Sequence, residues 1–475
     1  MTPVPPRSAA SLRLRIYRAG SWLGAREVLG LVVRLLGLLV TLRVLGPGQY
    51  GQYAGALAAI VFLTFVAQGG LENYLTRREE PFDDVAFDRA STYLLVSSTG
   101  VALAGLAISL GAGEVLAKGM SVPVFQVLLI AIPLNVLWAP AQARLDKALR
   151  FRAVARLELA GDVILHGASV ALVLAGLGVW ALVIAYVAWQ LWLLVVSHLL
   201  VRHLPRPRWS GPAALDMARF GLPFAGAQGL SAAEGLLNPL IVGPVAGTAG
   251  VGTVAVALRI LDTLGFVLRA GMRLAVVAFA TAQRDRARLA RGLEEAMLVQ
   301  VLVLGSLLVA LGAALELLLV PLFGAEWEAV RTVVPVLAVA SLADAASSAQ
   351  IAYLQSFGRS GAVVRMYAVK LAAVSVAALL LVPAMGIAGF ALAGALSSVA
   401  YLVAHRAVRV DVAYDPRPTA LWVVALAPLV LLGVLPGTWR LAAAAPLLAV
   451  LAVPLARAAV GRVLATGRRL ALGAD

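Results

Sequence analysis

Residues 20–71 read GSWLGAREVLGLVVRLLGLLVTLRVLGPGQYGQYAGALAAIVFLTFVAQGGL and hold two apolar runs separated by a turn. The runs, 20–45 and 53–71, are close to the roughly 20 apolar residues that a helix needs to cross a bilayer. Gly46 and Pro47 lie between them, and this pair of residues favours a change of chain direction. The stretch predicts two membrane-spanning helices joined by a tight turn, with one charged residue, Arg34, in the middle of the first.

The rest of the chain repeats this pattern. Of its 475 residues 61% are hydrophobic and 13% are charged, and the mean hydropathy is +0.93. A soluble domain needs more polar surface than this to cover its core, so a large soluble domain is excluded. We predict an all-α polytopic membrane protein with about 14 transmembrane helices. The expected spans lie near residues 20–45, 53–71, 93–110, 125–143, 159–175, 179–200, 220–243, 251–274, 296–320, 333–354, 363–382, 387–403, 421–435 and 441–456.

Metal and disulfide chemistry find no support in the composition. The sequence contains no cysteine, which excludes disulfides, iron–sulfur clusters and thiolate zinc sites. The four histidines are scattered along the chain instead of being spaced as ligands of one metal ion. We therefore expect no metal and no cofactor.

The basic residues follow the expected topology. The chain carries 39 Lys and Arg, and its formal net charge is +15. Most of these residues fall in every second connection between spans, while the intervening connections hold only Arg43, Lys118, Arg331 and Arg440. The positive-inside rule then places both termini in the cytoplasm. Because the positive charge is explained by topology, no nucleic-acid partner is expected.

Five basic residues fall within the expected spans and carry the functional information. A charge near the bilayer centre is costly, so it normally faces a cavity or a partner. Arg34 and Arg259 are the main candidates for contact with an anionic substrate, and Arg26, Arg269 and Lys370 are weaker ones. Arg26 and Arg269 lie near cytoplasmic helix ends, where a long side chain can instead snorkel to the interface.

Acidic residues accompany these cations at helical spacing. Glu27 precedes Arg34 by seven residues, and Asp262 stands seven before Arg269 and three after Arg259, so each set shares one helix face. Glu27 and Asp262 could titrate during transport or simply neutralise the adjacent arginines in structural ion pairs. Asp344 lacks a local charged partner and is the better candidate for coupling transport to an ion. The remaining acidic residues are Glu234 and Glu316 within the expected spans, and Asp162 and Glu72 nearer helix ends.

An internal repeat relates the two halves of the chain. Gly46 recurs as Gly247 at an offset of 201 residues, and Gly178 recurs as Gly386 at an offset of 208. Six expected spans separate the copies, so they share one orientation, as in parallel-repeat transporters; chance glycine turns at helix ends are the alternative. We predict two pseudo-symmetric six-helix lobes plus a C-terminal helix pair. The divisions are a cytoplasmic tail at 1–19, an N-lobe at 20–204, a cytoplasmic linker at 205–219, a C-lobe at 220–410, and helices 13 and 14 with a tail at 411–475.

Small residues mark the faces on which helices are expected to pack closely. They include Gly51 and Gly55 after the first turn, and Gly389 with Ala393 in the second half. Such residues let two helix backbones approach and slide.

Several short motifs, taken in order, resemble one family of membrane proteins. They are Leu45-Gly46-Pro47 with Tyr50, Gly51 and Tyr53; Leu149-Arg150-Phe151-Arg152 followed by Glu158-Leu159; Gly178-Val179-Trp180-Ala181-Leu182-Val183; Phe220-Gly221-Leu222-Pro223; and Leu258-Arg259 with Asp262. In this order they are similar to bacterial polysaccharide-biosynthesis flippases, in the polysaccharide transporter branch of the multidrug/oligosaccharidyl-lipid/polysaccharide superfamily. The chain departs from many relatives at Asn238-Pro239, where those carry an Asp and a basic residue.

The resemblance implies a transporter of the bacterial inner membrane and no enzyme. It implies that an undecaprenyl-pyrophosphate-linked glycan, such as a lipopolysaccharide repeat unit, moves from the inner to the outer leaflet while two lobes open alternately. Arginine suits this substrate because its planar fork pairs with phosphate oxygens through two bonds. The expected partners are membrane lipids, the polyprenyl-pyrophosphate-linked glycan and a glycosyltransferase or polymerase of the same pathway, and H+ or Na+ is the candidate coupling ion.

Two alternatives remain open at this point. A multidrug or small-molecule exporter of the same superfamily would share the two lobes, although such exporters usually have twelve helices and the extra pair here favours a lipid-linked substrate. A non-transporting scaffold of an envelope polysaccharide assembly complex would also fit the sequence. Absence of transport in proteoliposomes that contain a headgroup-labelled lipid-linked glycan would favour the scaffold.

Overall fold

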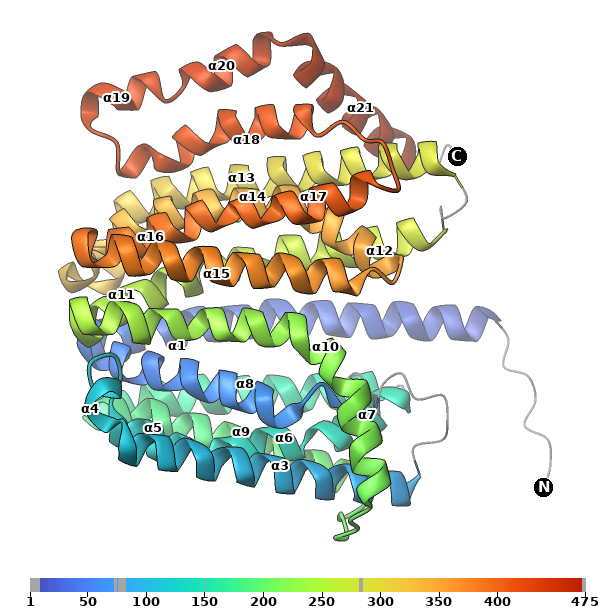
Figure 1. Cartoon of the computed structure of the whole chain (residues 1–475), viewed down its shortest axis with the longest axis vertical. Coiled ribbons are helices and arrows are strands. Elements are labelled where there is room, and N and C mark those ends of the chain that lie inside the picture. Colours follow the sequence, from blue (N-terminus) through green and yellow to red (C-terminus); the bar gives the residue numbers. More distant parts are fainter. Residues whose placement is uncertain (1–8, 72–74, 76–82, 149, 282–284, 472–475) are drawn as a thin grey trace. The chain divides into compact units, whose positions relative to one another are not determined.

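The computed structural model describes residues 9–71, 75, 83–148, 150–281 and 285–471, and the elements in them are helices (Figure 1). The chain divides into two compact units, residues 1–236 and 237–475, and each is described by itself. The expected linker at 205–219 belongs to the first unit by this division. The helix α10, Gly211–Leu237, ends at the boundary between the units.

Unit 1 contains six of the expected spans, carried on longer and shorter helices. The expected fourth span, 125–143, is divided into three short helices, and Pro133 and Pro140 lie in the first turns of the second and third, where a missing N–H is tolerated. The elements before α10 are α1 (Ala9–Gln68), α3 (Asp84–Gly111), α4 (Gly113–Leu116), α5 (Val122–Leu128), α6 (Ala131–Leu137), α7 (Ala139–Lys147), α8 (Phe151–Leu174) and α9 (Val179–Val201).

The helix α1 is divided at Gly46, as the sequence predicts. Gly46 has φ 65° and ψ 174°, a conformation that only glycine adopts without strain. Before it, α1 runs parallel to α8, since Gly30 lies beside Asp162 and Gly37 beside His166. After Gly46 the chain runs antiparallel to α3, because Ser97 donates to the carbonyl of Ala67 at 2.8 Å and the side chain of Leu63 lies next to Gly105. Because α3 and α8 both start from one end of the unit, the chain reverses at Gly46.

The same contacts define two ends of unit 1. At the first, which we call the basic end, Arg144 pairs with Asp84 at 2.6 Å, and the guanidinium of Arg150 donates to the carbonyl of Leu200 at 2.8 Å. The segment after α9 is held at this end by Asp88, a buried carboxylate that lies 2.8 Å from His203 Nε2 and accepts from the backbone N–H of Arg206. At the opposite end the Gly46 turn meets the turn before α9, where an ideal Cβ on Gly178 would lie 2.9 Å from Gln49 Oε1.

Unit 2 begins where α10 gives way to one π-helical turn, Asn238–Val242. Pro239 cannot donate a backbone hydrogen bond, and the buried amide of Asn238 donates to the carbonyl of Val251 at 3.0 Å. Asn238 and Pro239, the pair at which this chain differs from many relatives, therefore contribute to the packing of α10 against the helix that follows. The elements that follow are α11 (Gly243–Leu264), α12 (Phe266–Thr281), α13 (Arg286–Phe323), α14 (Val330–Ser356), α15 (Ser360–Met385), α16 (Ile387–Leu396), α17 (Tyr401–Arg409), α18 (Arg417–Val430), α19 (Gly437–Ala442), α20 (Ala445–Ala452) and α21 (Pro454–Ala471).

The backbone repeats between the units at the positions that the sequence repeat picks out. Gly247 has φ 63° and ψ −171°, which matches Gly46, and it divides α11 as Gly46 divides α1. Gly178 and Gly386, with φ 56° and 60° and ψ −136° in both, precede α9 and α16. Chance glycine turns would not give the same two conformations in the same order, so the structure supports an internal repeat at these positions, and the division into two six-helix lobes stays a prediction.

Two arginines, each just before the fifth helix of its set, donate hydrogen bonds to backbone carbonyls of the sixth. Arg150 precedes α8 and Arg359 precedes α15, with φ/ψ of −83°/43° and −85°/41°. As Arg150 does in unit 1, Arg359 donates to a carbonyl late in the sixth span of its set, that of Ala407, at 2.9 Å. Arg359 is also ion-paired with Asp411. The segment after α17 is held further by Tyr414, whose oxygen accepts from Gln350 at 2.7 Å, and burial raises the pKa of the Tyr414 hydroxyl so that it stays protonated.

The number of membrane-crossing helices depends on how the kinks are counted. Within the described residues ten helices are long and apolar enough to cross a membrane, or up to eleven if the pair Gly437–Ala452 and Pro454–Ala465, bent by 75°, is one span. Two of the ten, Val32–Gln68 and Gln228–Leu264, each contain a glycine kink and cover two expected spans. The expected thirteenth span falls on a shorter apolar helix, Arg417–Gly433. The all-α polytopic fold is confirmed, and the count of 14 stays a prediction.

Close packing at small residues gives a first testable expectation. An ideal Cβ on Gly55 would lie 2.2 Å from the carbonyl oxygen of Gly119, a backbone atom that cannot move aside cheaply, whereas one on Gly48 meets nothing within 4 Å. We expect Gly55→Ala to lower the free energy of unfolding by about 1–3 kcal/mol because of this overpacking. Thermal unfolding in detergent measures it, with Gly48→Ala as the matched control. Equal midpoints for the two variants would contradict the close approach of the Gly55 and Gly119 backbones.

Candidate functional site

Arg34 lies near the middle of the first span and shares its site with a carboxylate from another helix. It stands about 18 Å along the helix axis before Gly46, at 1.5 Å per residue. Its Nε donates to the carbonyl of Gly30 at 3.1 Å, and the side chain is half-buried. An ideal Cβ on Gly30 would lie 2.9 Å from Asp162 Oδ2 and 3.3 Å from Arg34 Nη2. The charged tips of Arg34 and Asp162 therefore converge over one glycine.

Asp162 is deeper than the sequence indicates. The expected span began at 159, which put Asp162 near a helix end, but α8 begins at Phe151. Asp162 thus lies about 17 Å into the helix, and it is 8% exposed. Its predicted position near a helix end is wrong because Phe151 to Glu158, although rich in charge, form the first two turns of the same helix.

His166 extends this polar site by one turn of α8. It follows Asp162 at the i, i+4 spacing that places two side chains on one helix face. An ideal Cβ on Gly37 would lie 2.7 Å from His166 Cβ, so Gly30 and Gly37 together allow α1 and α8 to approach closely. Arg34, Asp162 and His166 form what we call the α1/α8 site.

A second polar cluster lies in unit 2 and joins three helices. Tyr401 on α17 donates a hydrogen bond to Asp344 Oδ1, and Lys370 Nζ on α15 lies 4.0 Å from the same oxygen. The Lys370 side chain is 16% exposed and that of Asp344 is 36% exposed. Asp344 therefore has a charged partner, which its own helix does not supply. We call these residues the α14/α15 site.

The two sites lie at similar depths in their helices. Asp162 is residue 12 of α8, which begins at Phe151, and Lys370 is residue 11 of α15, which begins at Ser360. Each unit thus carries a charged side chain about three turns into this helix, acidic in unit 1 and basic in unit 2. A charge at such a depth in a membrane-crossing helix is costly, so it normally faces a cavity or a partner.

The basic residues predicted on α11 and α12 are arranged differently from expectation. Asp262 pairs with Arg269 at 3.2 Å, and a second Arg269 nitrogen donates to the Asp262 carbonyl at 3.4 Å. The helix breaks at Gly265 between them, which brings the side chains over that glycine. Arg259 is exposed on α11 one turn before Asp262. The seven-residue spacing of Asp262 and Arg269 therefore corresponds to an ion pair. The three-residue spacing of Arg259 and Asp262 corresponds to no ion pair that the structure describes.

Exposed charges on a membrane-crossing helix need water or a polar ligand beside them. Side chains of Arg269 and Asp262 are 57% and 69% exposed in the structure. Asp262 lies two residues before the end of the membrane-crossing helix Gln228–Leu264, and Arg269 follows that helix on α12, so both side chains can reach water at the end of the span. The Arg259 side chain projects from the same segment.

Other predicted residues have separate outcomes. Glu316 is paired with Arg440 at 3.0 Å and lies 3.9 Å from Arg331, so it belongs to an ionic cluster at the end of α13. Arg26 and Glu27 lie on α1, but their side chains fall outside those that the structure describes. Glu72 lies outside the described residues.

The chemistry available at these sites is ionic recognition. In the part of the chain that the structure describes, no group of three His, Cys, Asp or Glu side chains is close enough to hold a metal ion. Guanidinium groups can donate paired hydrogen bonds to phosphate oxygens. Neither His166 nor the approach of Asp162 to Arg34 over Gly30 was predicted from the sequence. The available signal was the i, i+4 spacing of Asp162 and His166.

Comparison with known proteins gives one family match. The family model described as polysaccharide biosynthesis protein matches residues 40–332. A succinoglycan biosynthesis transport protein, ExoT of Rhizobium meliloti (strain 1021), is 25% identical over 332 residues, or 69% of this chain. The alignment spans 66% of that relative's length, just under two thirds.

Solved structures share the fold. The inward closed conformation of the lipid II flippase MurJ matches with a TM-score of 0.71 at 11% identity, over 94% of this chain and 99% of that one. The inward-facing conformation of a multidrug resistance MATE family transporter of the MOP superfamily matches with a TM-score of 0.64 at 17% identity, over 82% and 97% of the two chains. These matches confirm the predicted fold, and the named relatives are transporters and a flippase, not enzymes.

Proposed function

Because the chain belongs to the polysaccharide biosynthesis protein family, we propose that it carries an undecaprenyl-pyrophosphate-linked oligosaccharide from the cytoplasmic to the outer leaflet of the bacterial inner membrane. In this proposal the basic end of unit 1 faces the cytoplasm, as the positive-inside rule requires. The two six-helix sets open alternately to either side. The observation that carries the proposal is the presence of guanidinium groups within the membrane spans of a chain from this family.

Arg34 is proposed as the main contact of the pyrophosphate. Its guanidinium is half-buried and stands about 18 Å along α1 before Gly46, at 1.5 Å per residue, and in this proposal a phosphate bound at that depth is removed from competing water. Asp162 keeps this site neutral when substrate is absent, so the arginine is retained at a lower desolvation cost. Arg259 and Arg269 are proposed as further contacts along the exposed face of α11 and α12, with Arg26 and Lys370 as weaker ones.

Asp344 is proposed as the group that couples transport to H+ or Na+. It accepts from Tyr401 and faces Lys370, and its side chain is partly exposed, so water can reach it. Protonation of the carboxylate would leave Lys370 without its counter-charge, and the α14/α15 site would then favour a different packing. This gives the protein a local switch whose two states differ in charge.

A multidrug exporter is the second candidate, and the match to the multidrug transporter fold is the observation that favours it. The share of this chain that each solved structure covers distinguishes the two candidate functions in part. The flippase fold covers 94% of this chain and the multidrug fold 82%, as expected if the C-terminal helices are an addition to a twelve-helix core. We therefore place the lipid-linked substrate first.

Leaflet-resolved transport by purified protein tests the proposal. Proteoliposomes would contain a polyprenyl-pyrophosphate glycan with a fluorescent headgroup, and a membrane-impermeant quencher would report the outer leaflet. We expect protein-dependent equilibration between leaflets, and no extrusion of cationic dyes by the same vesicles. Dye extrusion without movement of the lipid would support the exporter instead, and movement of neither would contradict both.

A further inference from the structure

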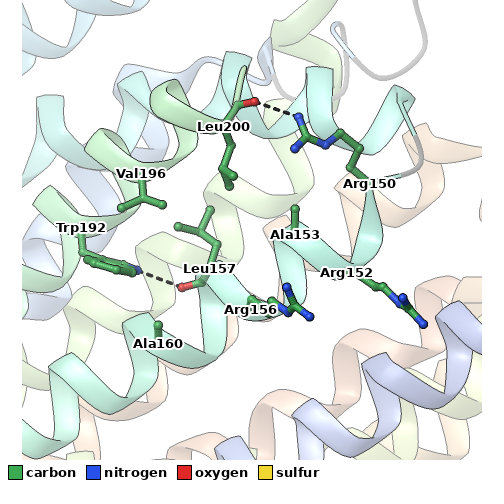
Figure 2. Close-up of a pocket in the computed structure, with 9 residues that line it drawn as sticks. All are labelled: Arg150, Arg152, Ala153, Arg156, Leu157, Ala160, Trp192, Val196 and Leu200. Atoms are coloured by element: carbon green, nitrogen blue, oxygen red, sulfur yellow. Dashed lines mark hydrogen bonds between the residues drawn. The ribbon is translucent and has the colours of Figure 1, made fainter. Parts of the chain in front are cut away.

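A second basic site lies in unit 1, on residues of α8 and α9 that are distinct from those of the α1/α8 site. A cavity of about 660 Å³ opens between the first turns of α8 and the last turns of α9, at the basic end (Figure 2). Its volume is within the range of small-molecule sites. The residues that line it are Arg150, Arg152, Ala153, Arg156, Leu157, Ala160, Trp192, Val196 and Leu200.

The charged residues that line this cavity are all arginines. Arg150, Arg152 and Arg156 lie on the first two turns of α8 or just before it, and none of the nine described lining residues carries a carboxylate. Figure 2 shows Arg150 turned toward Leu200, to whose carbonyl it donates, while the side chains of Arg152 and Arg156 point away from Leu200. Two guanidinium groups one turn apart can hold one phosphate between them.

The remaining wall is apolar. Trp192 Nε1 donates to the carbonyl of Leu157 at 3.1 Å, so the polar atom of the indole is bonded and the ring forms part of the wall. Ala153 and Ala160 have small side chains that leave room beside the ring, and Val196 and Leu200 continue the wall along α9. A soluble anion would leave this surface unused, whereas an acyl chain would cover it.

We propose that this cavity binds an anionic phospholipid of the cytoplasmic leaflet, with its phosphate on Arg152 and Arg156 and one acyl chain against Trp192. Three features favour this occupant over a free anion: the uniform positive charge, the apolar wall and the position at the end of two membrane-crossing helices. Basic pockets between helices on the cytoplasmic side bind lipid headgroups of this kind. The lining residues are distinct from those of the α1/α8 site, and the proposal does not depend on the transported substrate.

Quenching of Trp192 by brominated lipid tests this site directly. The full chain would be placed in phosphatidylcholine nanodiscs with a rising fraction of phosphatidylglycerol brominated in its acyl chains. We expect saturable quenching at a low fraction of the anionic lipid, and loss of that component in Trp192→Phe, which isolates this residue among the nine tryptophans. Brominated phosphatidylcholine at the same fraction should give no saturable component.

Matched arginine variants identify the headgroup contacts. Arg152→Gln with Arg156→Gln should weaken apparent phosphatidylglycerol affinity by about fivefold per arginine, or about 25-fold in total. The control, Arg89→Gln with Arg219→Gln, removes the same charge from exposed positions that do not line the cavity, and its affinity should stay within about twofold of wild type. Thermal midpoints of both variants show whether the fold is retained, and Arg152→Lys with Arg156→Lys offers a milder change if the first variant unfolds.

Three outcomes would overturn the proposal. The first is equal quenching by brominated phosphatidylcholine and phosphatidylglycerol. The second is equal loss of affinity in the test and control variants. The third is displacement of the lipid by millimolar inorganic phosphate, which would make the cavity a site for a soluble anion. None of these measurements uses transport, so failure here and failure of the proposed function are distinguishable.

Discussion

Arg34→Gln is expected to slow leaflet-resolved transport of a polyprenyl-pyrophosphate glycan by about 100-fold. This magnitude assumes that two charge-assisted hydrogen bonds to phosphate are lost, at roughly 1.5 kcal/mol each. The loss should be largest for this residue because Arg34 lies near the middle of its span and is half-buried with Asp162, where water competes least.

A charge-matched control distinguishes the specific effect of Arg34 on the transport rate from the effect of removing any positive charge from α1. Arg43→Gln removes a guanidinium from the same stretch of α1, at an exposed position near the Gly46 turn, and should change the rate by less than about threefold. Arg34→Gln also leaves Asp162 without that cation, so Arg34→Gln with Asp162→Asn should recover stability without recovering transport. A double variant that transports at the wild-type rate would show that the arginine neutralises Asp162 and does nothing more.

Asp344→Asn is expected to abolish the acceleration of transport by an ion gradient while leaving substrate binding intact. The amide keeps the size of the side chain but cannot be protonated, so the α14/α15 site loses its two charge states. We expect the gradient-driven rate to fall about 10-fold or more, toward the rate without a gradient. The measurement compares both rates across pH or sodium steps in proteoliposomes.

Glu316→Gln is the matched control for this variant. Glu316 is also a carboxylate of unit 2 and is paired with Arg440, but it belongs to the ionic cluster at the end of α13. Its substitution should leave the gradient dependence unchanged. Substrate affinity of Asp344→Asn, measured by binding of labelled lipid, must stay near wild type; a loss of binding equal to the loss of rate would contradict a coupling role.

The sequence predicted the membrane fold and its repeat for physical reasons that are local. Apolar runs report spans directly, and Gly46, Gly178, Gly247 and Gly386 mark positions of positive φ that glycine adopts without strain. The C-terminal pair was harder to predict. Val453 is extended before Pro454, as expected of a residue that precedes proline, and the helices on either side are bent by 75°, so the hydropathy of 441–456 does not describe a straight span.

The site was predicted less completely because its contacts cross between helices. A lone arginine in an apolar run identified Arg34, but nothing in the spacing of one helix could join it to Asp162, which lies on α8. In the same way Asp344 and Lys370 were each singled out, and only the packing of α14 against α15 brings them together. Spacing along one chain succeeded for Asp262 and Arg269, although the break at Gly265 contributes to their contact.

Arg34 is proposed to recognise the pyrophosphate of a lipid-linked glycan within the membrane. The most direct measurement is the ratio of transport rates for a polyprenyl-pyrophosphate glycan and for the same glycan on an uncharged polyprenyl ether, in wild type and in Arg34→Gln. We expect a ratio well above one in wild type that falls toward one in the variant. The same ratio in both proteins would contradict this role of Arg34.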